Sequence, residues 1–364
     1  MKERNNRPKK PFIIAGPCSV ESREQTLATI RGLAACGRID MIRGGVWKPR
    51  TSPNCFQGVG EEGLAWLAEA KRETGLPFGV EVANARHLEA ALQAGADMVW
   101  IGTRTTGNPF SVQEVADALR GVDRVMVCVK NAPVADTGLW TGAVERLAAA
   151  GVSGERLWLI HRGFAQEVDG AYRNPPAWHV ALEMRRRFPQ LRMLCDPSHM
   201  CGRRELLAQT MQKAADLLYD GLFVESHIAP DQALSDAGQQ VTPAELCRML
   251  AGICWRSEEA HQPQFEQELE RYRLEIDQLD DQLFSLLSRR MRVVERIGRI
   301  KRENGVTILQ RRRWGEIVEN LTGRAAALNL SRDFIRTVLD AIHMESIAHQ
   351  NRVMNDAEDP AEQR

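Results

Sequence analysis

Four residues of the kinds that bind transition metals each accompany a separate short apolar run. Cys18 follows FIIAG, His199 follows MLCDPS, Glu225 lies within LFVESH, and Asp236 comes a little later. One thiolate, one imidazole and two carboxylates together suit a borderline divalent ion such as Mn, Fe, Co or Zn, rather than Mg or Ca. Each of these residues alone is more often a packed thiol or a hydrogen-bonded loop residue. The metal hypothesis therefore depends on a fold that brings all four together.

Five basic residues lie within or just after other apolar runs: Arg43, Lys48, Arg104, Lys130 and Arg162. Cations gathered in one pocket repel each other and are costly to bury, and a bound polyanion removes that cost. Arginine forks suit phosphate and carboxylate oxygens, with lysine as a point charge. Arg43 stands in mid-run between apolar neighbours, where an unpaired charge is expensive. A metal beside such a pocket indicates a phosphorylated substrate and a polarised carbonyl.

The elements that must position these residues follow an alternating pattern. Eight strand-like runs are separated by amphipathic helical stretches such as 61–73, 85–95 and 203–218; the runs are 12–16, 41–47, 77–82, 98–102, 125–130, 157–161, 193–198 and 222–227. Eight strands, each followed by a helix, over about 250 residues predict an α/β fold of the (β/α)8 TIM-barrel type. A doubly wound sheet would normally open with a GxGxxG turn, whereas this chain has AGPCS.

In a closed barrel the reactive groups lie at the carboxyl ends of the strands. The seventh, eighth and first strands become neighbours, so we expect His199, Glu225 and Cys18 to converge, with Asp236 joining them. Glu81 ends the third strand and Asp196 follows the seventh, which places both among the polar groups of the same mouth.

A different pattern begins after residue 255. Apolar positions at intervals of three and four predict one long helix at 265–303, followed by helices at about 310–323 and 331–353. Three helices cannot bury so long an apolar stripe alone, so this part should dimerise. The predicted organisation is a barrel domain at 1–255, a linker at 256–264, a helical domain at 265–355 and a disordered tail at 356–364.

Basic residues stand among the apolar positions of the long helix. Arg290 and Lys301 are about 20° apart around its axis and share a face, whereas Arg273 lies roughly 25 Å from Arg290 along the helix. Arg273 cannot serve the same small ligand from the same chain. In an antiparallel dimer it reaches the Arg290 and Lys301 cluster of the other chain, which predicts two shared sites.

Composition sets outer bounds on function. The net charge is zero, so no broad nucleic-acid-binding surface is expected, and the run Arg311–Arg313 is weak evidence for one. The charged first residues and the lack of any eighteen-residue apolar window argue against secretion and membrane insertion. Eight cysteines without paired spacing indicate free thiols in a reducing compartment, and hence a cytoplasmic protein.

The segments AGPCS, KPRTSP, IHRGF, YRNPP, DPSH and ALSDAGQ resemble 3-deoxy-D-arabino-heptulosonate 7-phosphate (DAHP) synthase, in its compact barrel group, over about 11–255. This resemblance implies a divalent metal held by Cys18, His199, Glu225 and Asp236. It implies phosphoenolpyruvate bound by Arg43, Lys48, Arg104, Lys130 and Arg162, with Asp196 also in the substrate site. Erythrose 4-phosphate would lie against Lys48, Pro49, Arg50 and Thr51. Lys48 is then expected to protonate the new alkoxide, and Glu81 to help handle the attacking water.

Residues 265–350 resemble the all-helical chorismate mutase. Six positions fall on that family's binding residues without gaps: Arg273, Arg290, Lys301, Arg313, Ser346 and Gln350. The implied reaction is the rearrangement of chorismate to prephenate, in which cations hold two carboxylates while Lys301 and Gln350 hydrogen-bond the ether oxygen. Gln310 and Trp314 depart from the pattern, because the familiar bacterial enzymes carry acidic residues there.

The sequence alone leaves two alternatives open. The helical domain could serve mainly as an allosteric sensor and dimerisation module, a role that Gln310 and Trp314 favour. The barrel could be the sister synthase that uses arabinose 5-phosphate, which KPRT disfavours because the sister family carries Asn in place of that Pro. We further expect prephenate or chorismate to regulate the barrel, and a homodimer or homotetramer to assemble through the helical domain, with the barrel as a second contact.

Overall fold

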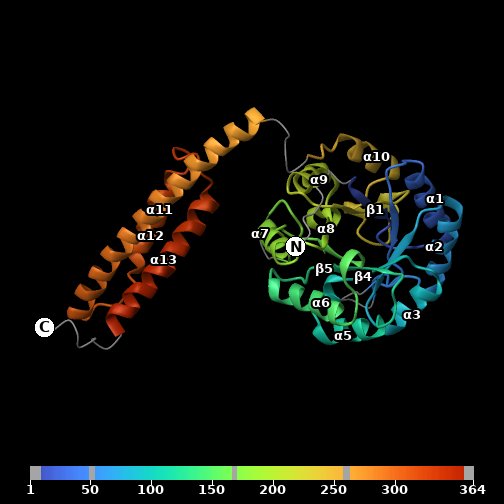
Figure 1. Ribbon diagram of the computed structural model, residues 1–364, viewed down its shortest axis with the longest axis horizontal. Coiled ribbons are helices and arrows are strands. Elements are labelled where there is room, and N and C mark those ends of the chain that lie inside the picture. The colour runs from blue at the N-terminus through green and yellow to red at the C-terminus, as the bar shows by residue number, and fades with distance from the viewer. Residues whose placement is uncertain (1–9, 49–53, 166–169, 257–262, 356–364) are drawn as a thin grey trace. The chain divides into compact units, whose positions relative to one another are not determined.

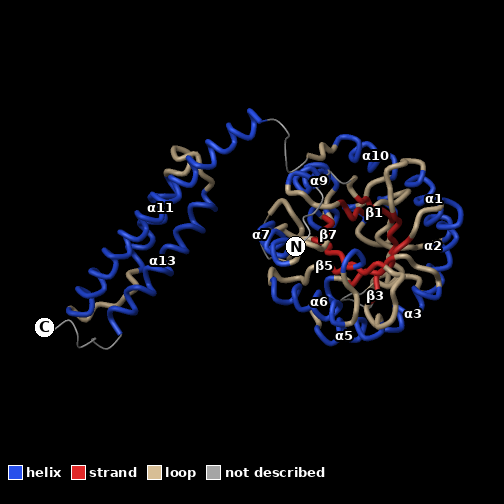
Figure 2. The backbone as a smooth tube through the Cα atoms, in the orientation of Figure 1, coloured by secondary structure: helices blue, strands red, loops and turns tan. Residues whose placement is uncertain are grey.

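The predicted (β/α)8 barrel is confirmed by the computed structural model, which describes residues 10–48, 54–165, 170–256 and 263–355. Eight parallel strands close in chain order, each pairing with the next and β8 with β1 (Figures 1 and 2). The strands are β1 Phe12–Gly16, β2 Met41–Gly44, β3 Phe78–Val82, β4 Met98–Ile101, β5 Met126–Lys130, β6 Leu157–His161, β7 Arg192–Cys195 and β8 Gly221–Glu225.

Helices surround the barrel (Figure 2). They are α1 Arg23–Ala34, α2 Glu61–Thr74, α3 Ala85–Gln93, α4 Thr103–Thr106, α5 Pro109–Ala118, α6 Thr137–Ala149, α7 Trp178–Arg187, α8 Pro197–Cys201, α9 Leu207–Asp216 and α10 Pro243–Gly252. Local sequence explains several starts, because Ser22, Asn84, Asp136 and Thr242 each accept a backbone N–H of the first turn.

Side chains alternate along each strand and so fill two layers. The barrel interior holds an apolar cluster that includes Met98, Trp100 and Phe223, while a larger cluster packs between the strands and the helices. Two positions on from inward-facing residues such as Phe223, the same faces carry ionisable groups such as Glu225 at the strand ends. Because of this two-residue period, ionisable groups at the strand ends form a ring at the carboxyl end of the barrel, next to the apolar cluster of its interior.

The expectation that all eight cysteines are free thiols is wrong for one pair. Cys36, after α1, and Cys247, in α10, form a disulfide with their Cα atoms 5.8 Å apart. The two residues are separated by 211 positions, so their spacing gave no signal. Closure of the barrel packs the first helix against the last, and Gly32 of α1 leaves room for Pro243 of α10.

The chain divides into two compact units, Met1–Glu259 and Ala260–Arg364. The second unit contains α11 Pro263–Glu303, α12 Arg311–Gly323 and α13 Arg332–Asn355. Its small buried cluster contains Ala325, Ile335 and Leu339. Most of the predicted linker and the whole predicted tail at 356–364 lie outside the described residues.

Along α11 the apolar stripe remains exposed over most of its length. Its exposed members include Tyr272, Ile276, Leu279, Leu283, Leu286 and Ile300. No helix in the described part of the chain combines the length and the apolar character that a bilayer-spanning segment requires.

Candidate functional site

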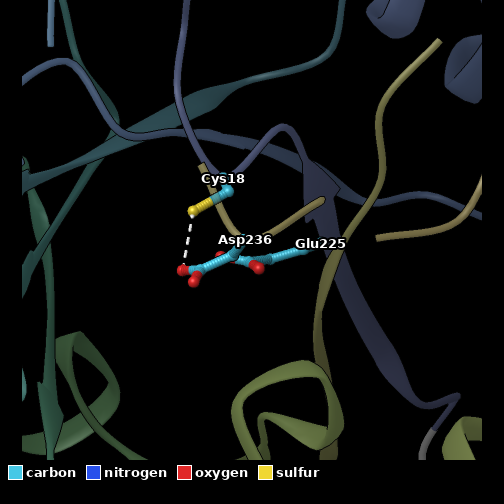
Figure 3. Close-up of side chains that lie close together, drawn as sticks. All are labelled: Cys18, Glu225 and Asp236. Carbon is cyan, nitrogen blue, oxygen red and sulfur yellow. Dashed lines mark hydrogen bonds between the residues drawn. The ribbon is translucent and has the colours of Figure 1, made fainter. Parts of the chain in front are cut away.

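Cys18, Glu225 and Asp236 come together at the carboxyl end of the barrel, with their ligand atoms within 4.8 Å of one another (Figure 3). Cys18 follows β1, Glu225 ends β8, and Asp236 lies in the loop beyond β8. The Cys18 Sγ lies 3.4 Å from Asp236 Oδ2. His199, the fourth expected ligand, falls outside this mutual distance, although its Nε2 lies 3.6 Å from Glu225 Oε1.

The donor atoms of this group fit a divalent ion. Glu225 is fully buried, and its Oε1 accepts no hydrogen bond of normal geometry, so the Arg43 ion pair at 3.1 Å balances its charge but leaves its hydrogen-bonding capacity open. Its other oxygen, Oε2, accepts a 2.7 Å bond from Gln239. The soft thiol, the imidazole and the carboxylates match the ligand set of a borderline metal ion.

Electrostatics within the group are strongly perturbed. Burial raises the pKa of the Cys18 thiol to about 12, with Glu225 adding to the effect and Lys48 opposing it. Burial also raises the pKa of Glu225, but His199 and Arg43 outweigh it and hold that pKa below its usual range. The Cys18 thiol is therefore protonated near neutrality in the absence of a metal ion, while the Glu225 carboxylate is charged.

Two of the predicted cations are buried and paired with acids. Arg43, in β2, lies with NH1 3.1 Å from Glu225 Oε1, and its guanidinium packs over the rings of Trp100 and Phe223. Lys130, at the end of β5, donates a 2.7 Å bond to Asp196. These pairs balance charge in the interior without filling the mouth above it.

Asp196 connects the cations to the expected ligand His199. It caps α8 by accepting the His199 backbone N–H at 3.1 Å, and it lies 2.8 Å from the His199 Nδ1. Although burial raises the pKa of Asp196, the attraction of His199 and Lys130 brings it well below its ordinary value. The carboxylate therefore fixes the ring orientation of His199.

Lys48 lies in the site, although it does not directly follow a strand as the sequence pattern predicts. The strand β2 stops at Gly44, and the chain then turns back so closely that a Cβ on Gly45 would lie 2.4 Å from the Cys18 carbonyl oxygen. Lys48 Nζ consequently lies 3.0 Å from Cys18 Sγ and 3.2 Å from the Cys18 carbonyl oxygen. Burial lowers the pKa of Lys48, but the nearby Cys18 and Glu225 outweigh it, and the net shift is upward.

A cavity of about 340 Å³ opens beside this group. Its lining includes the predicted residues Lys48, Glu81, Arg104, Lys130, Arg162, His199 and Asp236. Glu81 is held by the Trp100 indole N–H at 3.1 Å. The arrangement can hold a small polyanion next to a metal ion, because basic residues line the cavity together with His199 and Asp236 of the expected ligand set.

Not every polar residue at a strand end faces the mouth. Since β6 ends in His161, the sequence pattern places this residue with Arg162 in the polar ring, but its side chain turns into the outer layer, where Nδ1 lies 2.8 Å from the Tyr219 hydroxyl. His161 ends β6 one residue after the inward-facing Ile160, so the strand's alternation points it at the helices. The predicted residues Pro49, Arg50 and Thr51 lie outside the described residues.

Sequence reasoning assigned no role to Arg173 and Asn174, which also line the cavity. Asn174 accepts a 2.7 Å bond from Arg162 NH1 and donates a 2.6 Å bond to the His199 carbonyl oxygen. Arg173 pairs with Asp236 at 2.9 Å. The YRNPP segment had drawn attention only through the family resemblance, because neither residue ends a strand.

In the helical unit, the predicted residues Arg290, Lys301, Ser346 and Gln350 come from the facing helices α11 and α13. Arg290 NH1 donates a 2.5 Å bond to Ser346, and Lys301 Nζ donates a 2.5 Å bond to the Ile308 carbonyl oxygen. The Gln350 Oε1 is buried and has no hydrogen-bond partner among the described residues. Burial lowers the pKa of both Arg290 and Lys301.

The remaining predicted residues of that unit point to solvent within one chain. Arg273 is 64% exposed and contacts Glu270, and Arg313 is 70% exposed and contacts Glu316. A hollow of about 530 Å³ is lined by Lys301 and Gln310, among others. Trp314, the second departure from the mutase pattern, lies in α12 and stacks on His343 of α13, with the two ring centroids 3.9 Å apart.

Comparison with known proteins identifies both parts. Residues 3–262 match the DAHP synthetase I family, and residues 272–351 match chorismate mutase type II. Phospho-2-dehydro-3-deoxyheptonate aldolase of Thermotoga maritima is 35% identical over 65% of this chain and 67% of its own. A 2-dehydro-3-deoxyphosphooctonate aldolase of Syntrophotalea carbinolica is 27% identical over 65% of this chain and 87% of its own. A crystal structure of the Thermotoga maritima DAHP synthase has a TM-score of 0.59 at 30% identity, over 67% of this chain and 68% of that one.

Proposed function

Since the chain belongs to the DAHP synthetase I family and continues into a chorismate mutase type II domain, we propose that its two reactions take place at the two sites described above. The chain is thus a bifunctional enzyme of the shikimate pathway. Its barrel condenses phosphoenolpyruvate with erythrose 4-phosphate to DAHP and phosphate, and its helical domain rearranges chorismate to prephenate.

The condensation is metal-dependent, with the ion held by Cys18, Glu225, Asp236 and His199. The single observation that carries this assignment is the close approach of the buried Cys18 thiol, the buried Glu225 carboxylate and the partly buried Asp236 carboxylate beside the cavity. An ion of the Mn, Fe, Co or Zn class bound there would polarise the aldehyde carbonyl of erythrose 4-phosphate. A small movement of the His199 ring completes the ligand set, because its Nε2 is already directed towards Glu225.

Phosphoenolpyruvate lies in the cavity, where its phosphate and carboxylate neutralise the cations of the lining. Arg162 is braced by Asn174, and Lys130 by Asp196, so both present fixed positive groups to the ligand. Arg104 lines the same cavity, whereas Arg43 does not line it and is paired with Glu225. Binding then requires little reorganisation of the protein.

Lys48 is the proton donor to the alkoxide formed from the aldehyde oxygen. Its ammonium group lies 3.0 Å from the Cys18 sulfur and lines the cavity, so it stands between the metal group and the substrate space. Its raised pKa keeps it protonated until the alkoxide forms. Glu81, fixed by Trp100 at the same cavity, handles the water that attacks the second carbon of phosphoenolpyruvate.

The mutase site is completed by a second copy of the chain. Within one chain, Arg290, Lys301, Ser346 and Gln350 lie along facing helices, whereas Arg273 is exposed far along α11. The helix is also divided in charge: residues 263–282 carry seven acidic and two basic residues, and residues 283–303 carry two acidic and seven basic ones. An antiparallel pair of α11 helices buries the exposed apolar stripe and sets each acidic half against a basic half.

In that dimer Arg273 and Arg290 of different chains hold the two carboxylates of chorismate, with Arg313 as a further cation. Lys301 and the unpaired Gln350 amide hydrogen-bond the ether oxygen as charge develops on it. Prephenate occupying this site feeds back on the barrel, so that the product of the second reaction limits the first. The barrel adds a second contact in a homotetramer.

Two assays on the full chain test the assignment. The rate of condensation is measured from the loss of phosphoenolpyruvate absorbance. It is measured first with protein treated with a chelator and again after Mn has been restored to that protein. Dependence on the added ion is expected, and full activity of rigorously metal-free protein would refute it. Prephenate added to the condensation assay should lower the rate, and the same prephenate should have no effect in Arg290→Ala protein if the helical site carries the feedback.

A further inference from the structure

Each carboxylate of the proposed metal group has one oxygen held by the protein and one turned towards the group. Asp236 Oδ1 accepts a 2.9 Å bond from Arg173, while Oδ2 lies 3.4 Å from Cys18 Sγ. Glu225 Oε2 accepts a 2.7 Å bond from Gln239, while Oε1, which is ion-paired with Arg43 NH1 at 3.1 Å, accepts no hydrogen bond of normal geometry. The two carboxylates thus present one oxygen each to the proposed metal.

One guanidinium nitrogen connects these two held oxygens. Arg173 NH1 donates to Asp236 Oδ1 and, at 3.0 Å, to Gln239 Oε1. The amide of Gln239 then donates through its Nε2 to Glu225. Gln239 is 1% exposed, so both ends of its amide are committed to this chain of bonds. Asp236, Arg173, Gln239 and Glu225 form one continuous bracket around the outer side of the metal group.

The main chain of Arg173 is also held in place, by contacts with the end of the helix that carries His199. The Arg173 N–H donates to the Cys201 carbonyl oxygen at 3.3 Å, at the end of the short helix that carries His199. The residue after Cys201, Gly202, has a φ of +65°, and a Cβ there would lie 2.5 Å from the Arg173 Cβ. A glycine in the left-handed region therefore lets the His199 helix end against Arg173.

From this bracket we propose that Arg173 and Gln239 are positioning residues that select which carboxylate oxygens bind the metal ion. The proposal rests on the metal site proposed above. Groups that hold the outer oxygens of metal-ligating carboxylates commonly set affinity, because they fix ligand orientation before the ion arrives. A carboxylate that is free to rotate must first be ordered, and it can swing away to pair with one of the cations of the mouth.

Arg173 also lines the cavity, and 53% of its side chain is exposed. A contact with a substrate phosphate is therefore a competing explanation for any loss of activity. Ion binding in the absence of both substrates separates the two roles, since removing a cation that only binds phosphate would leave the affinity of the empty protein for Mn²⁺ unchanged or raise it, whereas removing a positioning residue lowers it. The test must therefore measure the metal itself.

Metal-free full-length protein is titrated with Mn²⁺, and unbound ion is measured by electron paramagnetic resonance. In Arg173→Gln protein the Mn²⁺ dissociation constant is expected to rise about 10- to 100-fold. Arg173→Lys, which keeps the charge without the two-way geometry, should give an intermediate loss. Arg203→Gln is the matched control, because Arg203 donates to the backbone carbonyl groups of Gly170 and Ala171 rather than to a carboxylate of the metal group.

Two results would overturn the proposal, and they differ in what else they overturn. Wild-type protein that binds no Mn²⁺ would remove the metal site and the bracket together. Wild-type protein that binds one ion, with Arg173→Gln binding it equally well, would remove the bracket alone. Thermal unfolding of each metal-free variant, which should match wild type because Arg173 is half exposed, confirms that the fold is intact.

Discussion

Arg43 and Glu225 form an ion pair inside the barrel, with NH1 of Arg43 3.1 Å from Oε1 of Glu225 and both side chains almost wholly excluded from solvent. Arg43 packs over the rings of Trp100 and Phe223 in the barrel interior, and Glu225 belongs to the proposed metal group. Arg43 therefore balances the buried charge of Glu225.

Replacing Arg43 with Met should destabilise metal-free protein by about 3–5 kcal/mol, because it leaves the Glu225 carboxylate buried without its guanidinium counter-charge. The measurement is the midpoint of thermal unfolding of the barrel. The double variant Arg43→Met with Glu225→Leu should recover most of the loss, since an apolar pair of similar volume removes the buried charge altogether. Equal stability of the single variant and wild type would contradict a stabilising ion pair.

Replacing Lys48 with Met should lower kcat for the condensation about 10²- to 10⁴-fold, the range typical of a lost proton donor. Lys48→Arg keeps the charge but moves the donor, and should recover only part of the rate. Steady-state kinetics with both substrates saturating measure the effect. If kcat stayed at the wild-type value while only KM rose, Lys48 would be a binding residue and its assigned role would be wrong.

Mixing two inactive mutase variants should restore activity if the sites are shared. Arg273→Ala protein and Arg290→Ala protein each lose both sites of their own dimers. A mixed dimer has one site in which both residues are intact, so random exchange should recover about a quarter of wild-type chorismate turnover. Chorismate absorbance is followed after the chains are exchanged under mild denaturation. No recovery, with exchange verified by mass-tagged chains, would show that the sites are not built from two chains.

His161 should make the barrel less stable in acid. Burial lowers its pKa from 6.5 to about 3, so the unfolded chain binds a proton that the folded barrel excludes. Between those values the unfolded state holds more protons, and the free energy of unfolding therefore rises with pH. The contribution is complete above pH 6.5 and is lost as the pH falls towards 3.

The test compares His161→Gln with wild type between about pH 6.5 and pH 4, a range within the window over which the imidazole titrates differently in the two states. The variant is expected to be less stable throughout, because the bond to Tyr219 is altered, but its unfolding midpoint should fall less steeply as the solution is acidified. Identical slopes for the two proteins would show that His161 does not titrate in this way. The carboxylates contribute equally to both proteins, so the difference between the two slopes reports the titration of the His161 imidazole.

Much of the barrel follows from local pattern. The runs at 12–16 and 157–161 coincide with β1 and β6, because alternating apolar residues and flanking turns leave little freedom in a closed parallel barrel. The predicted second strand extended through 47, whereas β2 ends at Gly44. Gly44 and Gly45 supply no side chain to pack, and the close approach to Cys18 that they permit is a tertiary feature.

The polar ring could be predicted in outline because strand ends gather at one place. Cys18, Glu225 and Asp236 meet there as expected. Loop residues that hold the ligand side chains could not be predicted from strand ends. Arg173, for example, is 63 positions from Asp236 and ends no strand. The Cys36–Cys247 pair was missed for the same reason, since only barrel closure brings its two helices together.

Every role assigned in the barrel depends on Cys18, His199, Glu225 and Asp236 holding one divalent ion beside a cation-lined cavity. Anomalous diffraction from crystals grown with Mn²⁺ and phosphoenolpyruvate would locate that ion. We expect one strong anomalous peak within bonding distance of all four side chains, with the enol phosphate contacting Lys130 and Arg162. A well-ordered enol phosphate with no peak between those side chains, or with the ion bound elsewhere, would contradict the assignment.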